Sequence, residues 1–429
     1  MDRTFLLGKI LSYVQSGNEK FSLGAGSNII KYQRLEPLLI DKLYNEFNGE
    51  EILISKKLLK KHFRSYLNTA KNTENPKDYV NANIADLKDI IYTQKVVDYE
   101  IYFPLNISTS KPSSLKEISV IDNNLTNQSR TQWREKIKYC KEEDKVAGKH
   151  IEELDLPISS QFSYWMFQTS ARDEYFAIQE LNDLLQIVLG VINLAAYGYT
   201  HSQRWTKNSH LYGTSNITMP PVGLVYESDK YATCYCSEDE SPRQRNSLNA
   251  KKFERAKKVS SAWTQLEITN SLKHVLERSL RFYQKGITSA NNEDAFLHFW
   301  RGLESITLQD NQKPQRNLLE KIQDILHVED EPVLKEQLKY YKNVRNDLVH
   351  GNNRIELTDD EKQTIRNWLE GFLEFYITAL TELSLEKDSM EFVLNHVGKS
   401  KESLNQQKKV YRRRIDILEK LLQNQEENP

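Results

Sequence analysis

The sequence is poor in cysteine and carries no excess charge of one sign. Its 429 residues include three cysteines, Cys140, Cys234 and Cys236, and a single residue separates the last two. This number and spacing suit neither a disulfide framework nor a four-ligand zinc site, so we interpret the thiols as structural or incidental. The 59 Lys and Arg residues are balanced by 60 Asp and Glu residues. Any contact with nucleic acid must therefore come from a local patch.

Long apolar runs and the common catalytic motifs are also missing. The most apolar stretch, residues 181–197, is interrupted by four polar residues, Asn182, Asp183, Gln186 and Asn193. It predicts a buried helix rather than a membrane span, and the N-terminus lacks a secretory cleavage pattern. No glycine-rich phosphate loop, HExxH pattern or metal-spaced carboxylate cluster occurs. We expect a cytoplasmic protein with no membrane role, no cofactor and no metal.

What the sequence does have is the composition of a folded globular protein, with 38% hydrophobic and 28% charged residues. The chain is long enough for two or three domains. Residues 238–258 are charged, include Pro242 and show little apolar periodicity, so we predict a linker there. This linker would separate a domain of residues 1–237 from a domain of residues 259–429.

The first predicted domain mixes strand and helix patterns. Aromatic and β-branched residues are enriched in five strand-like runs, at residues 51–55, 96–107, 162–168, 222–227 and 231–236. Ser170 and Asp173 precede a long apolar-periodic helix that ends near Tyr197. The serine hydroxyl can cap the first turn, and the acid favours the positive end of the helix. We therefore predict a mixed α/β domain.

The second predicted domain contains only helices. They are expected at residues 262–285, 295–308, 317–327, 332–350, from Thr358 through 376, and 400–425. Asn292 is the expected cap of the second helix. Pro332 stands near the start of the fourth helix and Gly351 follows its end, which is the usual placement of these two residues. Thr358 and Glu361 form a capping box for the fifth. The fold class is therefore α+β, with a C-terminal helical bundle.

Three polar residues gather near the end of the helix at residues 332–350. The buried stripe of that helix is expected to contain Leu338, Tyr341, Val344 and Leu348. Arg345, Asn346 and His350 lie off the centre of this stripe. Asn346 and His350 are four residues apart and share one face, whereas Arg345 must use its long side chain to approach them.

The segment RNDLVHG, residues 345–351, resembles the signature of the HEPN superfamily. The helix FLHFWRGLESI, residues 296–306, precedes it as in the Apea-like HEPN branch of that superfamily. The resemblance covers roughly residues 262–385, a usual length for a small domain. It implies an all-α HEPN bundle that acts as a metal-independent endoribonuclease. It also implies a homodimer, or a higher even-numbered assembly, in which two signature helices face each other.

The residue types fit that chemistry. His350 can act as general base or acid because its pKa is ordinarily near neutrality. Arg345 can present a planar, permanently charged fork to the scissile phosphate of an RNA substrate, and Asn346 can orient His350 or a phosphate oxygen. Glu304 matches the position of an acid in several family ribonucleases, where it would pair with Arg345 or orient the imidazole.

The predicted final helix carries a run of basic residues. Lys408, Lys409, Arg412 and Arg413 belong to it. A run of this kind is usually a solvated helix face, and the alternative interpretation is a surface that receives the RNA backbone.

The resemblance implies a toxin or anti-phage effector that is controlled by the N-terminal domain, through a trigger ligand or a protein. One alternative is a catalytically silent HEPN domain that serves as a dimerisation module or as the partner of a nucleotidyltransferase. A second alternative is an RNA-binding or ligand-binding regulator whose working site lies entirely in the N-terminal half.

Overall fold

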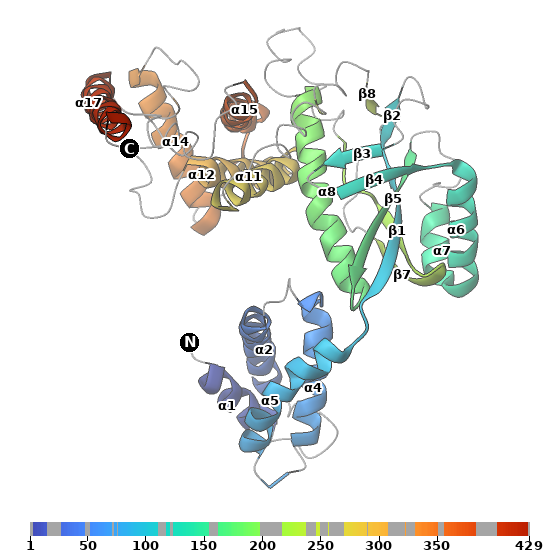
Figure 1. Cartoon of the computed structure of the whole chain (residues 1–429). Coiled ribbons are helices and arrows are strands. Elements are labelled where there is room, and N and C mark those ends of the chain that lie inside the picture. Colours follow the sequence, from blue (N-terminus) through green and yellow to red (C-terminus); the bar gives the residue numbers. More distant parts are fainter. Residues whose placement is uncertain are drawn as a thin grey trace.

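A computed structural model describes most of the chain. The described residues are 3–14, 27–47, 52–70, 73–74, 76–109, 117–120, 123–153, 162–197, 217–236, 246–248, 256, 270–289, 291–307, 322, 331–350, 356–382 and 401–427. They contain both helices and an antiparallel sheet (Figure 1), which agrees with the predicted α+β class.

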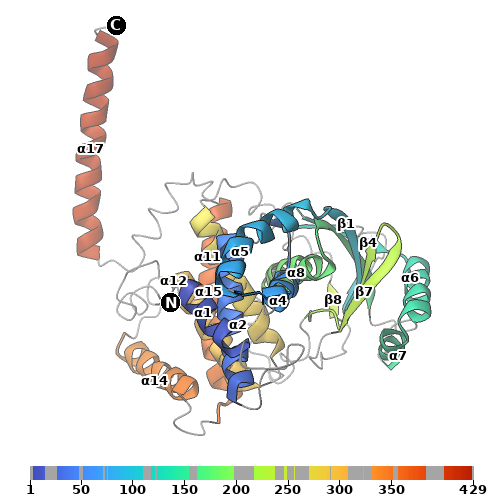
Figure 2. The same ribbon diagram turned by 90° about the horizontal axis from the view of Figure 1, so that it is seen from below.

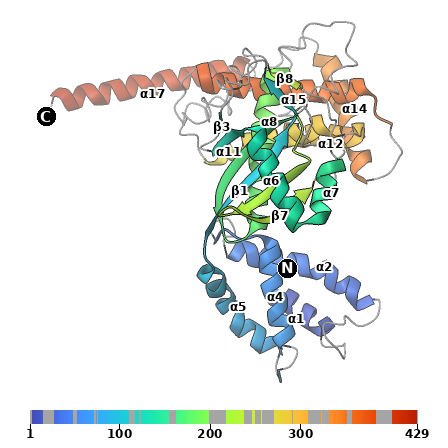
Figure 3. The same ribbon diagram turned by 90° about the vertical axis from the view of Figure 1, so that its right-hand side faces the viewer.

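Helices form the N-terminal part of the described chain. They are α1 (Arg3–Val14), α2 (Ser27–Glu46), α4 (Lys56–Ala70) and α5 (Pro76–Thr93). Their apolar residues make a hydrophobic cluster of their own, and the four helices lie together below the sheet (Figures 1 and 3). The predicted strand at residues 51–55 is wrong. Ile52 and Ile54 are buried within this helical cluster, and an apolar run of that length does not distinguish a strand from a buried loop.

The strands form one six-stranded sheet and one short pair. They are β1 (Val97–Leu105), β2 (Ile107–Thr109), β3 (Glu117–Val120), β4 (Asn123–Gln128), β5 (Ser163–Ala171), β6 (Val222–Glu227), β7 (Lys230–Cys236) and β8 (Asn246–Leu248). The sheet has the order β3-β4-β5-β1-β6-β7, with every neighbouring pair antiparallel. β2 and β8 pair in parallel. The four predicted strands after residue 95 are confirmed, whereas β3 and β4 were not predicted.

Helices cover both faces of the sheet. α8 (Glu174–Tyr197) lies against one face, and α6 (Arg130–Glu143) and α7 (Lys145–Glu153) lie against the other (Figure 1). The alternation along β1 explains this arrangement, because Ile101 and Phe103 belong to the cluster around α8, whereas Tyr102 belongs to the cluster around α6.

α8 is the predicted long apolar helix, and Asp173 caps it. The Oδ1 atom of Asp173 accepts hydrogen bonds from the backbone N–H groups of Tyr175 and Phe176, at 3.0 and 3.1 Å. Ser170, the other predicted cap, instead donates its hydroxyl to Asp98 in the neighbouring strand. By length and composition alone α8 is the one described helix that would suffice to cross a membrane, and 67% of its most apolar stretch is buried inside the protein.

The C-terminal described residues are helical. The helices are α11 (Asn270–Thr288), α12 (Asn292–Thr307), α14 (Glu331–His350), α15 (Asp359–Glu382) and α17 (Lys401–Glu427). Residues 262–269 of the first predicted helix lie outside the described residues. Of the predicted helix at residues 317–327, only Ile322, which is buried and helical, is described. α17 extends away from the remaining helices (Figures 2 and 3).

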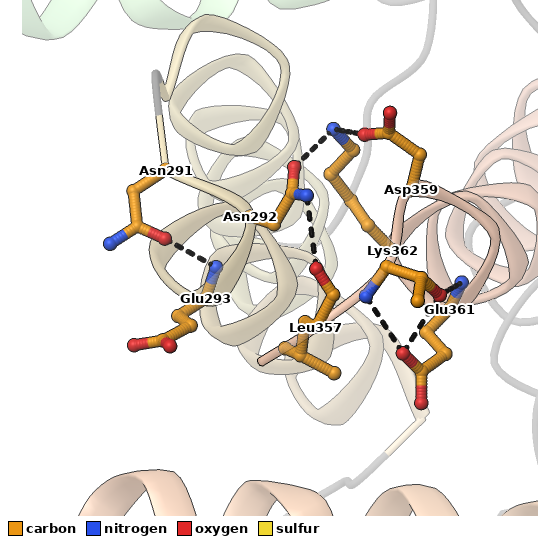
Figure 4. Close-up of polar contacts among 8 residues, drawn as sticks. Asn291, Asn292, Glu293, Leu357, Asp359, Glu361 and Lys362 are labelled. Carbon is orange, nitrogen blue, oxygen red and sulfur yellow. Dashed lines mark hydrogen bonds and ion pairs between the residues drawn. The ribbon is translucent and has the colours of Figure 1, made fainter. Parts of the chain in front are cut away.

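Polar contacts at the helix starts join α12 to α15 (Figure 4). Asn291, rather than the predicted Asn292, caps α12, because its Oδ1 accepts the N–H of Glu293 at 2.7 Å. Asn292 instead donates to the carbonyl of Leu357 and accepts from Lys362. The capping box of Thr358 and Glu361 is confirmed by reciprocal hydrogen bonds between side chain and backbone.

One hydrophobic core joins the sheet to the C-terminal helices. It runs from β1 and β5 through α8 to α11, α12, α14 and α15. Most of the predicted linker, residues 238–258, lies outside the described residues; within it, 246–248 form β8 and Ala256 is buried in this core. The predicted domain boundaries remain predictions.

Candidate active site

The predicted signature helix is α14, and aromatic rings hold it against the neighbouring helices. Tyr341 and Val344 are buried. The ring centroid of Tyr341 lies 6.1 Å from that of Phe296 on α12 and 5.6 Å from that of Trp368 on α15. The two leucines of the predicted stripe are partly buried and pack against the same core. The stripe is therefore confirmed, and it determines which side chains of α14 remain accessible.

Arg345 reaches from the edge of the buried face of α14 to an acid on α12. Its Nη2 atom lies 3.8 Å from Oε1 of Glu304, and its Nη1 atom donates to Oδ1 of Asn346 at 3.2 Å. The indole N–H of Trp300 donates to the same Glu304 oxygen at 2.7 Å, so Glu304 is held from two sides. The side chains of Arg345 and Glu304 are 34% and 32% exposed. Solvent, and therefore a substrate, can reach this guanidinium.

His350 is exposed at the last residue of α14 and does not join that contact. An ideal helix turns about 100° per residue, so His350 lies about 140° around the axis from Arg345 and about 40° from Asn346. No hydrogen bond or ion pair of the His350 side chain is found among the described residues. Val349, which is 48% exposed, lies on the helix surface between Arg345 and Asn346.

The structure therefore brings together three of the four predicted site residues, Arg345, Asn346 and Glu304. The fourth, His350, lies on the same helix but on a different side of it from Arg345. No role was predicted for Trp300. Trp300 is buried, and its spacing of four residues from Glu304 was the available signal for their hydrogen bond.

The predicted RNA-contacting residues lie on α17, apart from the α14 site (Figure 2). Lys408, Lys409, Arg412 and Arg413 are all exposed. Apolar residues are exposed on the same helix, at Leu404, Val410, Ile415, Ile417 and Leu418. α17 is therefore an exposed helix with basic and apolar side chains, and the structure does not bring it to Arg345.

The arrangement around α14 can bind an anion and can transfer a proton. The planar guanidinium of Arg345 is positioned by a carboxylate and an amide, and a guanidinium can donate two parallel hydrogen bonds to a phosphate. His350 is exposed, so a substrate can reach its imidazole. Among the described residues, no group of three or more His, Cys, Asp or Glu side chains could hold a metal ion.

The chain was compared with protein-family models, curated proteins and solved structures. No protein-family model, no curated protein and no solved structure matches the chain.

Proposed function

We propose that this protein is a metal-independent endoribonuclease of the HEPN type, and that its active site is built on α14. The observation that carries the proposal is the anchored guanidinium of Arg345, held by Glu304 and Asn346 on the same helix as an exposed histidine. The RNDLVHG segment supplies the resemblance, and the geometry supplies groups suited to a phosphodiester.

The proposed reaction is an internal transesterification of RNA. The ribose hydroxyl oxygen attacks the neighbouring phosphorus and loses its proton to a base, while the bond from phosphorus to the leaving ribose oxygen breaks and that oxygen gains a proton. Negative charge grows on the phosphate oxygens, where a two-donor guanidinium stabilises it. One α14 helix offers a single His350 for two proton transfers.

Two copies of the chain would complete the set of catalytic groups. His350 and Arg345 point about 140° apart on one helix, so a single copy places its cation and its imidazole on different sides. A twofold contact between two α14 helices would bring each Arg345 and His350 near those of the symmetry mate. Val349 supports this arrangement, because it leaves an apolar side chain exposed between the polar residues of the site.

The remainder of the chain would regulate this activity. In this proposal the sheet and the N-terminal helices sense a trigger, and RNA cleavage serves as a toxin or anti-phage response. The continuous core from the sheet to α12 and α14 supports such coupling, because a change at the sheet can reach the site through packed side chains.

The decisive experiment is cleavage of single-stranded RNA by the purified full chain in the presence of a metal chelator. Wild-type protein should cut, and His350→Ala should lose cutting while its thermal unfolding stays unchanged, because His350 is exposed. Lys339→Ala, at an exposed residue on the same helix, is the matched control. A folded wild-type dimer that does not cut RNA would favour the silent HEPN module.

A further inference from the structure

A cavity of about 840 Å³ lies between α4 and the start of α8. It is lined by α4, by Gln94 after α5, and by four consecutive residues from Arg172 to Tyr175. This volume falls within the range of small-molecule sites. The cavity lies far from α14 along the chain and belongs to the part of the protein for which no motif suggests a role.

Basic side chains dominate one wall of the cavity. Lys57, Lys60, Lys61 and Arg64 all line it. They recur on α4 at spacings of three and four residues, so they form one stripe along the helix. The opposite face of α4 is apolar and buried through Leu59, Phe63 and Leu67. The packing of that face fixes the direction of the basic stripe.

Part of this charge is already neutralised. Arg64 and Lys60 both pair with the buried carboxylate of Glu36, at 2.6 and 2.9 Å. Burial would raise the pKa of Glu36, but the hydrogen bonds from Arg64, Lys60 and Tyr32 together outweigh it and hold the pKa below its ordinary value. These two cations are therefore positioned by the fold.

Lys57 and Lys61 are the two remaining lysines of the lining. Neither lysine forms an ion pair with any carboxylate among the described residues. The ammonium of Lys57 lies 3.3 Å from the ring centroid of Tyr175, which holds it at the wall. Burial, and then the charge of Lys61, lower the pKa of the neighbouring His62. An uncompensated positive charge therefore borders the cavity.

The acids in the lining do not cancel this excess. Asp173 directs its carboxylate to backbone N–H groups, at Ser55 and at the first turn of α8. Glu174 is the remaining acid, against five basic side chains that include Arg172. The lining therefore has a net positive charge, and it adds polar groups at Ser65, Asn68 and Gln94 that can bind sugar or base atoms.

The cavity also lies at the junction between the N-terminal helices and the sheet. The backbone N–H of Arg172 donates to the carbonyl of Leu53 at 2.9 Å, and its Nε donates to Ile52. Its Nη1 donates to the carbonyls of Tyr92 and Gln94. A molecule in the cavity would therefore contact both the N-terminal helices and the sheet, next to the hydrogen bonds of Arg172 that connect them.

We propose that this cavity binds a nucleotide-sized molecule that carries two or more adjacent phosphates. The free cations at Lys57 and Lys61 would receive the phosphates, and the positioned pair at Lys60 and Arg64 would complete the cationic wall. A ligand that bridges the junction would stabilise one relative placement of the N-terminal helices and the sheet. This site does not depend on the proposed nuclease activity.

Calorimetric titration of the full chain with ATP, GTP, tripolyphosphate and a short single-stranded RNA tests the proposal. Saturable binding of ATP, GTP or tripolyphosphate supports it, and equal affinity for ATP and tripolyphosphate would assign recognition to the phosphates alone. Binding of the RNA without binding of the three small polyphosphates would overturn it in favour of a nucleic-acid surface. The absence of saturable binding by all four probes would also overturn it.

Two double variants locate the binding. Lys57→Gln with Lys61→Gln should weaken the affinity about tenfold or more, because two charge-assisted contacts are lost. Lys138→Gln with Lys149→Gln removes the same charge from exposed sites on α6 and α7, and should leave the affinity within about twofold. Equal weakening in both variants would indicate diffuse electrostatic attraction and overturn the site. Thermal unfolding without ligand checks that both variants fold, and no step of this test uses RNA cleavage.

Discussion

Glu304 and Arg345 come from different helices, and their Oε1 and Nη2 atoms lie 3.8 Å apart. Both side chains are about one third exposed, so water screens their attraction and the pair adds little to folding stability. What the pair does is place a guanidinium. Trp300 fixes Glu304 by a hydrogen bond of 2.7 Å, and Glu304 in turn limits the positions that Arg345 can adopt.

We therefore predict that Glu304→Ala lowers the rate of RNA cleavage about tenfold to a hundredfold, because a displaced guanidinium no longer meets the phosphate. The midpoint of thermal unfolding should change little. Glu336→Ala, at a side chain 78% exposed on α14, is the control and should cleave normally. The measurements are the first-order rate constant of cleavage under single-turnover conditions and the unfolding midpoint. An unchanged rate constant for Glu304→Ala would show that Glu304 is not part of the site.

Arg345→Lys should lose nearly all cleavage although the charge is kept. A lysine ammonium is a point charge, and it cannot give a phosphate two parallel hydrogen bonds. Lys339→Arg makes the reverse exchange at an exposed position of the same helix and should cleave like wild type. Full activity of Arg345→Lys would show that Arg345 only attracts RNA electrostatically.

Val349→Glu should break the proposed dimer and abolish cleavage together. An exposed valine tolerates a charge in the monomer, whereas two such charges facing each other across a twofold axis repel. Val333→Glu introduces the same change at a side chain 51% exposed near the other end of α14 and should leave the dimer intact. Analytical ultracentrifugation and an RNA cleavage assay give the two readouts. A fully active monomer would contradict the composite site.

Glu370→Ala should destabilise the protein by about 3–5 kcal/mol, because it leaves a buried charge without its partner. Glu370 accepts hydrogen bonds of 2.7 Å from both Arg366 and Tyr283, and all three side chains are buried. Glu153→Ala breaks an exposed pair on α7 and should cost less than about 1 kcal/mol. Urea unfolding of the two variants gives the comparison, and equal costs would refute the prediction.

Glu36→Gln should destabilise the N-terminal helices by about 1–2 kcal/mol at neutral pH, because it weakens hydrogen bonds from the partly exposed Lys60 and Arg64 and from the buried Tyr32. The pKa of Glu36 is lowered in the folded state. Its contribution to stability is therefore present above the unfolded pKa and is lost as the pH falls through the folded pKa. The difference in unfolding midpoint between Glu36→Gln and wild type should shrink as the pH falls below about 4.5. A difference that stays constant would contradict the assignment.

The sequence predicts the central sheet well because burial leaves a local pattern there. β1, β5, β6 and β7 are rich in aromatic and β-branched residues, and all four were predicted. β3 and β4 were missed because β3 has only four residues and the sequence of β4, NNLTNQ, is polar. β4 pairs with the neighbouring β3 and with the distant β5. At residues 51–55 a strand was predicted that does not form. The apolar residues there pack into the cluster of the N-terminal helices instead.

The candidate site was predictable to the extent that helical spacing decides it. The stripe of α14 follows from periodicity, and so does the offset of Arg345 from the stripe. Gly351, the predicted C-terminal cap, lies outside the described residues. The contact with Glu304 depends on how α12 and α14 pack, so a family resemblance suggested it and the spacing within one helix could not. The basic stripe of α4 was visible in the segment KKLLKKHFR, but the cavity beside it depends on residues 172–175, more than a hundred positions later.

The sheet order also bears on how the chain matures during synthesis. β1 lies between β5 and β6, so it has no neighbour in the sheet until residues far downstream have left the ribosome. The N-terminal helices need only residues before 92 for their core, and they can fold first. The hydrophobic core that positions Arg345 and Glu304 includes α15, which ends at residue 382. A nascent chain therefore carries the proposed ligand-binding helix early and lacks the proposed nuclease site until residue 382 has been synthesised.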